Sequence, residues 1–313
     1  MDQVRQKTAI PREEYVSPGH LACQGCGAAL AMRLVLKGLG PETVLVVPAC
    51  CWSVINGPWY ASAVGVPFLH AAFETGASTA AGVGAAFAVR GIRATVVAWA
   101  GDGGTFDIGL QALSGAAERG DDLLYVCYDN EAYMNTGIQR SSATPWGAWT
   151  MTTPLPRGNR RPKKAILEIM AAHRIPYAAT ASVAHPEDLL AKVRRARALG
   201  GTRFLHILSP CPPGWRILPQ QTLQLARLAV ETRVFPLVEI EDGERVRITV
   251  IHRDGAPVAR YLEPQGRFQH VSTDEVAAIQ ASVDAVWARL VARAAASGNR
   301  NEEAGGRGSD GKN

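Results

Sequence analysis

The chain has 313 residues, of which 47% are hydrophobic and 19% are charged, and it carries a formal net charge of +5. This length allows a substantial core, arranged either as one large α/β domain or as two modest ones. No window predicts a signal peptide or a membrane span, so we expect a cytoplasmic protein. The basic stretches 157–164 and 192–197 lack the interleaved aromatic residues of nucleic-acid-binding motifs. The basic surface instead suits an anionic cofactor or an acidic partner.

The first hundred residues alternate predicted helices and strands. Small and apolar residues predict a helix at 26–39, and apolar runs predict strands at 43–47 and 68–73. A second helix, 76–89, is built from alanine, glycine and serine. Such a helix lets another backbone approach closely, either in a packed core or at a subunit contact.

The next segment contains the pattern with the clearest chemistry. A strand at 96–100 runs into Gly101-Asp102-Gly103-Gly104, and a helix at 105–119 and a strand at 123–128 lead to Asn130. Glycines let the backbone approach a phosphate, the Asp102 carboxylate can bind a hard divalent cation, and the side-chain oxygen of Asn130 can complete its shell. A right-handed crossover brings both residues to one carboxyl edge of a parallel sheet. The pattern predicts a metal-diphosphate clamp, and an ordinary strand-to-helix turn is the alternative.

The rest of the chain continues the alternation and then changes character. A long polar loop at 131–149 follows the second clamp residue, which favours a functional loop over a surface excursion. The predicted helices and strands after it lie at 163–173, 177–182, 186–199 and 204–208. An extension then adds a helix at 220–231, strands at 237–241 and 246–251, and a helix at 273–296. The predicted divisions are a binding domain at 17–215, a helix, hairpin and helix extension at 216–296, and a disordered tail at 297–313.

Six cysteines form the second informative pattern, and two of them have the CxxC spacing. They are Cys23, Cys26, Cys50, Cys51, Cys127 and Cys211. Single cysteines dispersed beyond strand ends suit a [4Fe–4S] cluster assembled from distant loops, while a zinc half-site, a thioredoxin-like dithiol and chance spacing are the alternatives. One of Cys50 and Cys51 is expected to be only a neighbour of such a cluster, and Cys127 is expected to be a buried apolar residue.

The clamp and the cysteines occur together with two further strings. These are YDNEAYMNTGIQRSSATP at 128–145 and Gly266-Arg267-Phe268. From Gly19-His20 to Trp215 the chain thereby resembles the thiamine-diphosphate-binding β subunits of 2-oxoacid:ferredoxin oxidoreductases, most closely those of the pyruvate:ferredoxin oxidoreductase (pyruvate synthase) type. The resemblance implies an α/β fold with a doubly wound, mostly parallel sheet of the thiamine-diphosphate-binding type and a small C-terminal α+β extension.

The resemblance also implies a role for individual residues. The [4Fe–4S] ligands would be Cys23, Cys26, Cys51 and Cys211. Mg²⁺ would be bound by Asp102, Asn130 and the main-chain carbonyl of Ala132, and the diphosphate would be lined by Gly101, Gly103 and Gly104. Asn135 would be the catalytic residue that faces the substrate and the thiazolium ring, with Thr136 and Gln139 beside it. Glu74 would lie near the cofactor or serve as a structural or interface carboxylate. Some relatives have Glu at the position of Ala28 and Thr at the position of Asn130.

The function implied is thiamine-dependent oxidative decarboxylation of a 2-oxoacid, with electrons passed to the cluster and the acyl group to coenzyme A. Pyruvate is the first expectation, and oxalate, a branched-chain 2-oxoacid, 2-oxoglutarate and an aryl glyoxylate are the alternatives. The expected partners are an α subunit that supplies the pyrimidine domain and an activating glutamate, a γ subunit, a ferredoxin-like δ subunit and an external ferredoxin. A non-oxidative thiamine-dependent decarboxylase component and a non-catalytic iron–sulfur or zinc module are the more distant alternatives.

Overall fold

The computed structural model describes residues 10–58, 60–252 and 254–306, with side chains described up to residue 297. Within these residues, strands form one eight-stranded sheet in the order β2-β1-β3-β4-β6-β5-β7-β8. The strands are β1 (Thr43–Pro48), β2 (Phe68–Ala71), β3 (Thr95–Gly101), β4 (Leu123–Asp129), β5 (Tyr177–Ser182), β6 (Thr202–Leu208), β7 (Val238–Glu241) and β8 (Arg245–Ile248). The first six are mutually parallel and the last two antiparallel, which confirms the predicted mostly parallel sheet.

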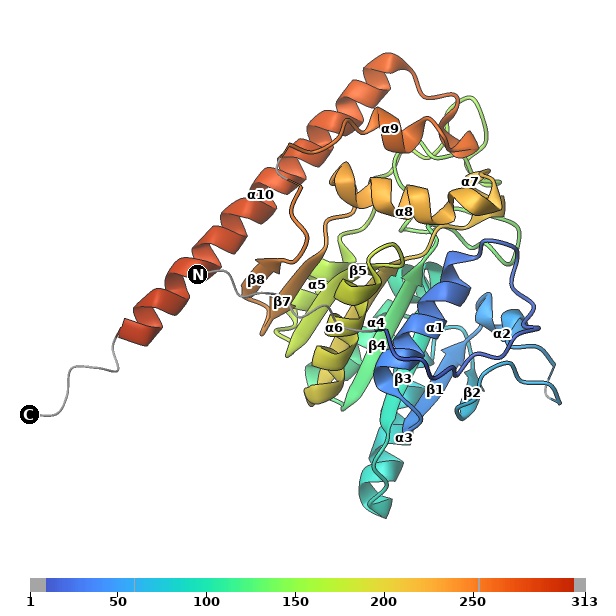
Figure 1. The fold of residues 1–313 in the computed structure, drawn as a ribbon, viewed down its shortest axis with the longest axis vertical. Helices are drawn as coiled ribbons and strands as arrows, with labels where there is room; N and C mark the ends of the chain where they lie inside the picture. The colour runs from blue at the N-terminus through green and yellow to red at the C-terminus, as the bar shows by residue number, and fades with distance from the viewer. Residues whose placement is uncertain (1–9, 59, 253, 307–313) are drawn as a thin grey trace, which may run out of the picture.

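Helices cover both faces of the sheet, as expected for a doubly wound fold (Figure 1). They are α1 (Gly27–Leu39), α2 (Trp52–Ile55), α3 (Gly76–Arg90), α4 (Leu110–Arg119), α5 (Ile166–Ala172), α6 (Pro186–Ala198), α7 (Pro212–Trp215), α8 (Thr222–Glu231), α9 (Ala259–Leu262) and α10 (Thr273–Gly306). Helices α1 and α6 pack on one face, and α3, α4 and α5 on the other. None of the helices in the described part of the chain is both long and apolar enough to cross a membrane.

Strands β3 and β4 are apolar along most of their length because both of their faces are covered. On β3, Val97 and Trp99 point towards α1, while Ala98 and Ala100 point towards α3. The larger side chains of β3 therefore pack on the face covered by α1, and the alanines pack on the face covered by α3. The predicted burial of Cys127 in β4 is confirmed, since its side chain is fully buried.

The topology brings the predicted site residues to one edge of the sheet. The chain passes from β1 to β2 on one side and then returns to β3 on the other, so the order reverses between β1 and β3. Loops beyond the carboxyl ends of strands at such a reversal commonly form binding sites. Gly101 pairs with Tyr128 across β3 and β4, and Asp129 pairs with Leu208 across β4 and β6. The segments that follow these three strands therefore start side by side.

The C-terminal extension is joined to the main sheet. Strand β7 pairs antiparallel with β5, so the predicted hairpin extends the main sheet. A third apolar cluster joins α8, α9 and the first half of α10 to the end of β6. Helix α10 also continues to Gly306, beyond the predicted end of the helix at residue 296, while 307–313 lie outside the described residues. The physical reason is a buried contact at Ser297, which accepts a hydrogen bond from the Val246 amide at 3.1 Å and donates to the Glu244 carbonyl.

A buried lysine fastens α6 to the sheet and provides a test of the fold. The Lys192 ammonium donates to Asp188 at 2.6 Å, to the Thr180 carbonyl at 2.7 Å and to the Thr249 hydroxyl at 2.8 Å. We expect Lys192→Met to lower the free energy of unfolding by about 3 kcal/mol, because it leaves a mostly buried carboxylate without its partner. Chemical denaturation measures this loss. Arg245→Met, which removes only exposed ion pairs, should change stability by less than about 1 kcal/mol.

Candidate functional site

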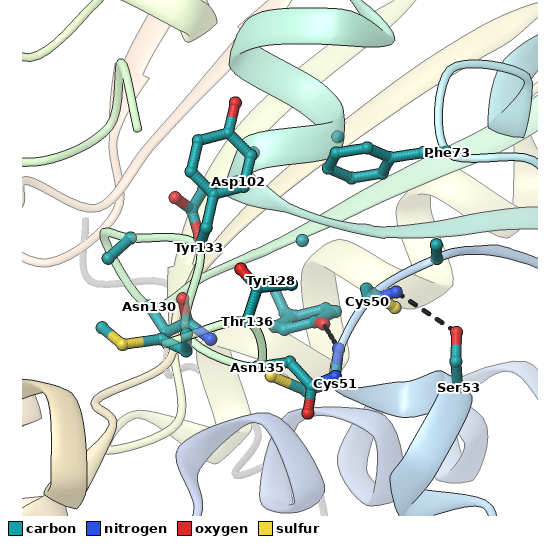
Figure 2. A pocket seen from close by; sticks show the side chains of 16 residues that line it. Cys50, Cys51, Ser53, Phe73, Asp102, Tyr128, Asn130, Tyr133, Asn135 and Thr136 are labelled. Carbon is teal, nitrogen blue, oxygen red and sulfur yellow. Dashed lines mark hydrogen bonds between the residues drawn. The ribbon is translucent and has the colours of Figure 1, made fainter. Parts of the chain in front are cut away.

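A cavity of about 260 Å³ opens at the carboxyl edge of the sheet, between the ends of β1, β3 and β4 (Figure 2). Its lining contains most of the residues predicted for the cofactor, namely Gly101, Asp102, Gly103, Gly104, Asn130, Ala132, Asn135 and Thr136. The other lining residues are Ala49, Cys50, Cys51, Ser53, Phe73, Tyr128, Tyr133 and Met134. Two polar predicted residues lie outside it. Glu74 is exposed beyond Phe73, and Gln139 braces the rim by bonding to the Thr136 hydroxyl and carbonyl at 2.6 and 2.8 Å.

The glycine turn after β3 is tightly packed, which explains its composition. A short π-helix, Gly103–Ile108, begins at the second glycine and continues into α4, so the predicted helix at 105–119 is divided in two. A Cβ atom at Gly103 would lie 2.2 Å from the ring of Tyr133, and one at Gly109 would lie 2.1 Å from the Gly104 carbonyl oxygen. Only glycine fits both places. Gly101, Gly103 and Gly104 line the cavity, where their lack of side chains leaves room for a diphosphate to approach the backbone.

Three oxygen-bearing groups converge beside this turn. In one orientation of the Asn130 amide, its nitrogen donates to Asp102 Oδ1 and to the Ala132 carbonyl oxygen, both at 2.9 Å. In the other orientation, the amide oxygen occupies the same place, 2.9 Å from each of the two oxygens. Neighbouring ligands of an octahedral Mg²⁺ with bonds of about 2.0–2.1 Å lie about 2.9 Å apart, so the separations of Asn130 from Asp102 and from Ala132 suit this cation. All three residues are buried.

The electrostatics of Asp102 also favour a cation. Burial raises the pKa of this carboxyl well above its usual range, and the negative charge of Asp129 raises it further. The Ser141 hydroxyl opposes the shift by donating to Asp102 Oδ2 at 2.5 Å, which leaves Oδ1 to face Asn130. Sequence reasoning did not single out Ser141 as a site residue, although it belongs to the polar loop that follows β4.

The four predicted cluster cysteines come from three separate segments that meet near the cavity. Cys26, Cys51 and Cys211 each directly precede the first residue of a helix, α1, α2 and α7 respectively. Burial raises the pKa of Cys51 to about 12, and the neighbouring thiols of Cys50, Cys211 and Cys26 contribute. Burial likewise raises the pKa of Cys211 to about 12, with contributions from Cys26 and Cys23, while an amide hydrogen bond from Gly214 lowers it. The sulfurs thus lie within electrostatic reach of one another, and helix-start amides hydrogen-bond the sulfurs of Cys26 and Cys211.

Cys50 directly precedes Cys51 but is not one of the four predicted ligands. Burial is the largest influence on the pKa of Cys50 and raises it, while hydrogen bonds with Tyr128 and Ser53 lower it. Figure 2 shows Cys50 facing the cavity beside Ser53, while the Cys51 amide donates to the Tyr128 hydroxyl at 3.0 Å. Sequence reasoning placed Tyr128 only at the end of a strand. In the structure it lines the cavity and its hydroxyl accepts from the Cys51 amide, so it connects the cavity to the Cys51 loop. Among the described residues, no three His, Cys, Asp or Glu side chains surround a point that a single metal ion would fill.

Gly27 controls how closely Cys26 approaches Cys211. The Gly27 amide donates to the Pro210 carbonyl at 3.1 Å, and a Cβ atom at Gly27 would lie 2.8 Å from the Pro210 backbone. We expect Gly27→Ala to push the two segments apart, to lower the free energy of unfolding by about 1–3 kcal/mol, and to speed thiol labelling of Cys211. Denaturation and labelling rates measure these effects. Gly82→Ala is the matched control, because a Cβ atom there meets nothing within 4 Å.

Known proteins resemble the chain over most of its length. Residues 64–207 match the family model described as thiamine pyrophosphate enzyme, C-terminal TPP binding domain. The chain is 47% identical over 299 residues to the ketoisovalerate oxidoreductase subunit VorB of Pyrococcus furiosus, an alignment that covers 92% of this chain and 96% of the relative. It is 50% identical over 285 residues to the pyruvate synthase subunit PorB of Methanothermobacter marburgensis, covering 90% of this chain and 99% of the relative.

A solved structure supports the fold. The 2-oxoglutarate:ferredoxin oxidoreductase from Magnetococcus marinus, with 2-oxoglutarate, coenzyme A and succinyl-CoA bound, superposes with a TM-score of 0.56 over 72% of this chain and 82% of that chain, at 22% identity. The family model, the identity to the curated relatives and the extent of both alignments agree. The chain belongs to the family of thiamine-diphosphate-binding β subunits of 2-oxoacid:ferredoxin oxidoreductases.

Proposed function

We propose that this chain is the catalytic β subunit of an enzyme that oxidatively decarboxylates a 2-oxoacid and transfers the acyl group to coenzyme A. The observation that carries the proposal is the convergence of Asp102, Asn130 and the Ala132 carbonyl beside a glycine turn, in one cavity of about 260 Å³. A magnesium ion held by three such oxygens can bind the diphosphate of thiamine diphosphate. Gly101, Gly103 and Gly104 would let the backbone approach that diphosphate.

Thiamine diphosphate supplies the carbanion chemistry when it is bound, and the protein supplies orientation and charge stabilisation. Asn135 lies at the open rim of the cavity, where its amide can donate to negative charge that develops on the reacting oxygen. Thr136 lies beside it and is held by Gln139 through two hydrogen bonds. Asp102 stays ionised when a cation offsets its burial and the charge of Asp129.

The four cysteines Cys23, Cys26, Cys51 and Cys211 would hold a [4Fe–4S] cluster. Such a cluster takes one cysteine per iron, so its ligands surround it instead of meeting at one point. The thiols come from three segments within electrostatic reach of one another, and helix-start amides offer hydrogen bonds to the sulfurs of Cys26 and Cys211. Free thiols remain available for ligation in a reducing cytoplasm, where we place the enzyme.

The open rim implies that partner subunits complete the site. Asn135 and Thr136 are exposed in the single chain, and Glu74 does not line the cavity. The glutamate that activates the aminopyrimidine would therefore come from an α subunit with a pyrimidine domain. A γ subunit, a ferredoxin-like δ subunit and an external ferredoxin would complete the assembly and carry the electrons away. Glu74 remains a candidate for contact with the α subunit.

Pyruvate is the substrate that we propose first, and a branched-chain 2-oxoacid is the second candidate. Relatives named for pyruvate synthase and for ketoisovalerate oxidoreductase are similarly close, at 50% and 47% identity. The choice depends on the side chains around the reacting carbon, part of which the α subunit would supply.

The test is to purify the chain with its partner subunits and to measure viologen reduction with a panel of 2-oxoacids, with and without coenzyme A. We expect Mg²⁺-dependent binding of thiamine diphosphate, coenzyme-A-dependent reduction, and a visible absorption band that dithionite bleaches. Decarboxylation without the band would instead identify a non-oxidative thiamine enzyme. A complex that binds no thiamine diphosphate in the presence of Mg²⁺ would refute the proposal.

A further inference from the structure

The residue between two of the proposed cation ligands has an unusual backbone conformation. Glu131 lies between Asn130 and Ala132 and adopts a φ of 70°, in the left-handed region that side-chain-bearing residues rarely occupy. The Glu131 amide donates to Asp129 Oδ1 at 2.9 Å, and its carbonyl accepts from the Thr144 hydroxyl at 2.7 Å. This turn aims the Ala132 carbonyl and the Asn130 side chain at the same point. Such a conformation persists when the surrounding structure holds it.

Two cations hold the side chain of Glu131, a buried Arg267 and a half-buried Lys163. Arg267 Nη2 lies 2.6 Å from Glu131 Oε2, and Lys163 Nζ lies 2.8 Å from Glu131 Oε1. The exposed fractions of the Arg267 and Glu131 side chains are 2% and 4%. Lys163 also lies 2.5 Å from Asp129 Oδ2, so both carboxylates that flank Asn130 share one cation. Burying the charges of Arg267, Glu131 and Asp129 is costly, and close ion pairs with good geometry are needed to offset that cost.

Arg267 itself is fixed by the C-terminal extension. Its guanidinium carbon lies 3.9 Å from the centroid of the Trp215 ring, and its Nε donates to Gln265 Oε1 at 2.9 Å. The indole nitrogen of Trp215 in turn donates to the Asn130 carbonyl oxygen at 2.8 Å. The contacts form a closed ring that runs from Arg267 through Glu131 and Asn130 to Trp215 and back to Arg267.

We propose that Glu131 and Arg267 are positioning residues for the divalent cation. Their ion pair holds the Asn130–Ala132 turn, so that two of the three oxygens meet the Asp102 carboxylate at a separation that suits the cation. The inference rests on the proposed function, because it presumes the cation site. It gives the extension at 216–296 a role in holding the cation site, although the extension is far from the glycine turn in sequence. Groups that orient metal ligands typically contribute about 10- to 100-fold to metal affinity.

The test uses Arg267→Met in the complex with the partner subunits, because Met keeps an apolar stem against Trp215 and removes the guanidinium. We expect the Mg²⁺ concentration for half-maximal thiamine diphosphate binding to rise by about 10- to 100-fold. Arg267→Lys, which keeps the charge but loses the planar fork, should show an intermediate increase. Hydrogen exchange of the Glu131 and Ala132 amides should speed up even without cofactor. Arg293→Met is the control. Arg293 lies in α10 of the same extension, its exposed ion pair with Glu168 of α5 is remote from Glu131 in the chain, and both measurements should stay unchanged.

The possible outcomes separate the inference from the proposed function. A folded Arg267→Met complex with the Mg²⁺ dependence of the wild type would overturn the inference alone. A wild-type complex whose thiamine diphosphate binding needs no divalent cation would overturn the cation site and the inference together. If Arg267→Met does not fold, Glu131→Gln decides, since it keeps the shape of the side chain while weakening both ion pairs. An unchanged Mg²⁺ requirement in that variant would also overturn the inference.

Discussion

Asp102→Ala is expected to weaken Mg²⁺-dependent binding of thiamine diphosphate by at least about 100-fold, because removing a group that merely orients a metal ligand already costs about 10- to 100-fold. Asp102 is the charged member of the three converging oxygen groups, and its carboxylate is buried at the end of β3. Calorimetric titration of the purified complex with thiamine diphosphate, at several fixed Mg²⁺ concentrations, measures the loss.

The same carboxylate should destabilise the fold when no cofactor is bound. Burial and the charge of Asp129 raise the pKa of Asp102, which means that its ionised form is disfavoured in the fold. Asp102→Asn is therefore expected to lose thiamine diphosphate binding while remaining at least as stable as the wild type in denaturation without Mg²⁺. Asp121→Ala, which removes a surface ion pair with Arg119, is the control that should bind normally. Unchanged binding in Asp102→Ala would show that this carboxylate does not hold the cofactor, and would favour an iron–sulfur or zinc module as the role of this chain.

Cys51→Ala is expected to abolish the visible absorption band and most of the iron content of the purified complex, because a [4Fe–4S] cluster needs all four thiolate ligands. Cys51 directly precedes α2, within electrostatic reach of Cys26 and Cys211. Iron analysis and absorption before and after dithionite measure the effect. Thiamine diphosphate binding should change far less than it does in Asp102→Ala, since the two sites use different side chains.

Cys50→Ala provides a matched comparison one residue away. The Cys50 thiol hydrogen-bonds with Tyr128 and Ser53 and faces the cavity. We expect this variant to keep its iron and its absorption band. The opposite result, with iron lost in the Cys50 variant and kept in the Cys51 variant, would exchange the two assignments. Loss in neither variant would argue against a cluster at this position.

Much of the sheet and of the clamp could be predicted because the signals are local. The apolar runs at β3 and β4 and the glycines after β3 lie within short windows, and the helix between them fixes a right-handed crossover. From those facts alone, Asp102 and Asn130 were expected at one edge of the sheet, and the registers of β3, β4 and β6 agree. The side chains that brace the clamp were not predicted. Ser141 contacts Asp102 from a polar loop without a regular period, so no spacing rule points to it.

The C-terminal extension was the least predictable part of the fold. The hairpin at β7 and β8 was expected from its turn, but its pairing with β5 was not, because the choice of neighbour depends on which sheet edge remains open. The end of α10 was placed too early for the same kind of reason. A polar, glycine-rich composition predicts disorder, yet Ser297 docks on the hairpin and the helix continues.

Local patterns along the chain were enough to predict the order of most strands and helices, the glycine turn after β3, and the pairing of the Asp102 carboxylate with the Asn130 amide. Periodicity and turn chemistry act over a few residues, so they can be read along the chain. Three features could be seen only in the folded chain: the ion pair of Arg267 with Glu131, the closeness of Cys211 to Cys26, and the position of Glu74 outside the cavity. Such contacts join residues far apart in sequence, and they depend on how the helix layers and the extension pack over the sheet.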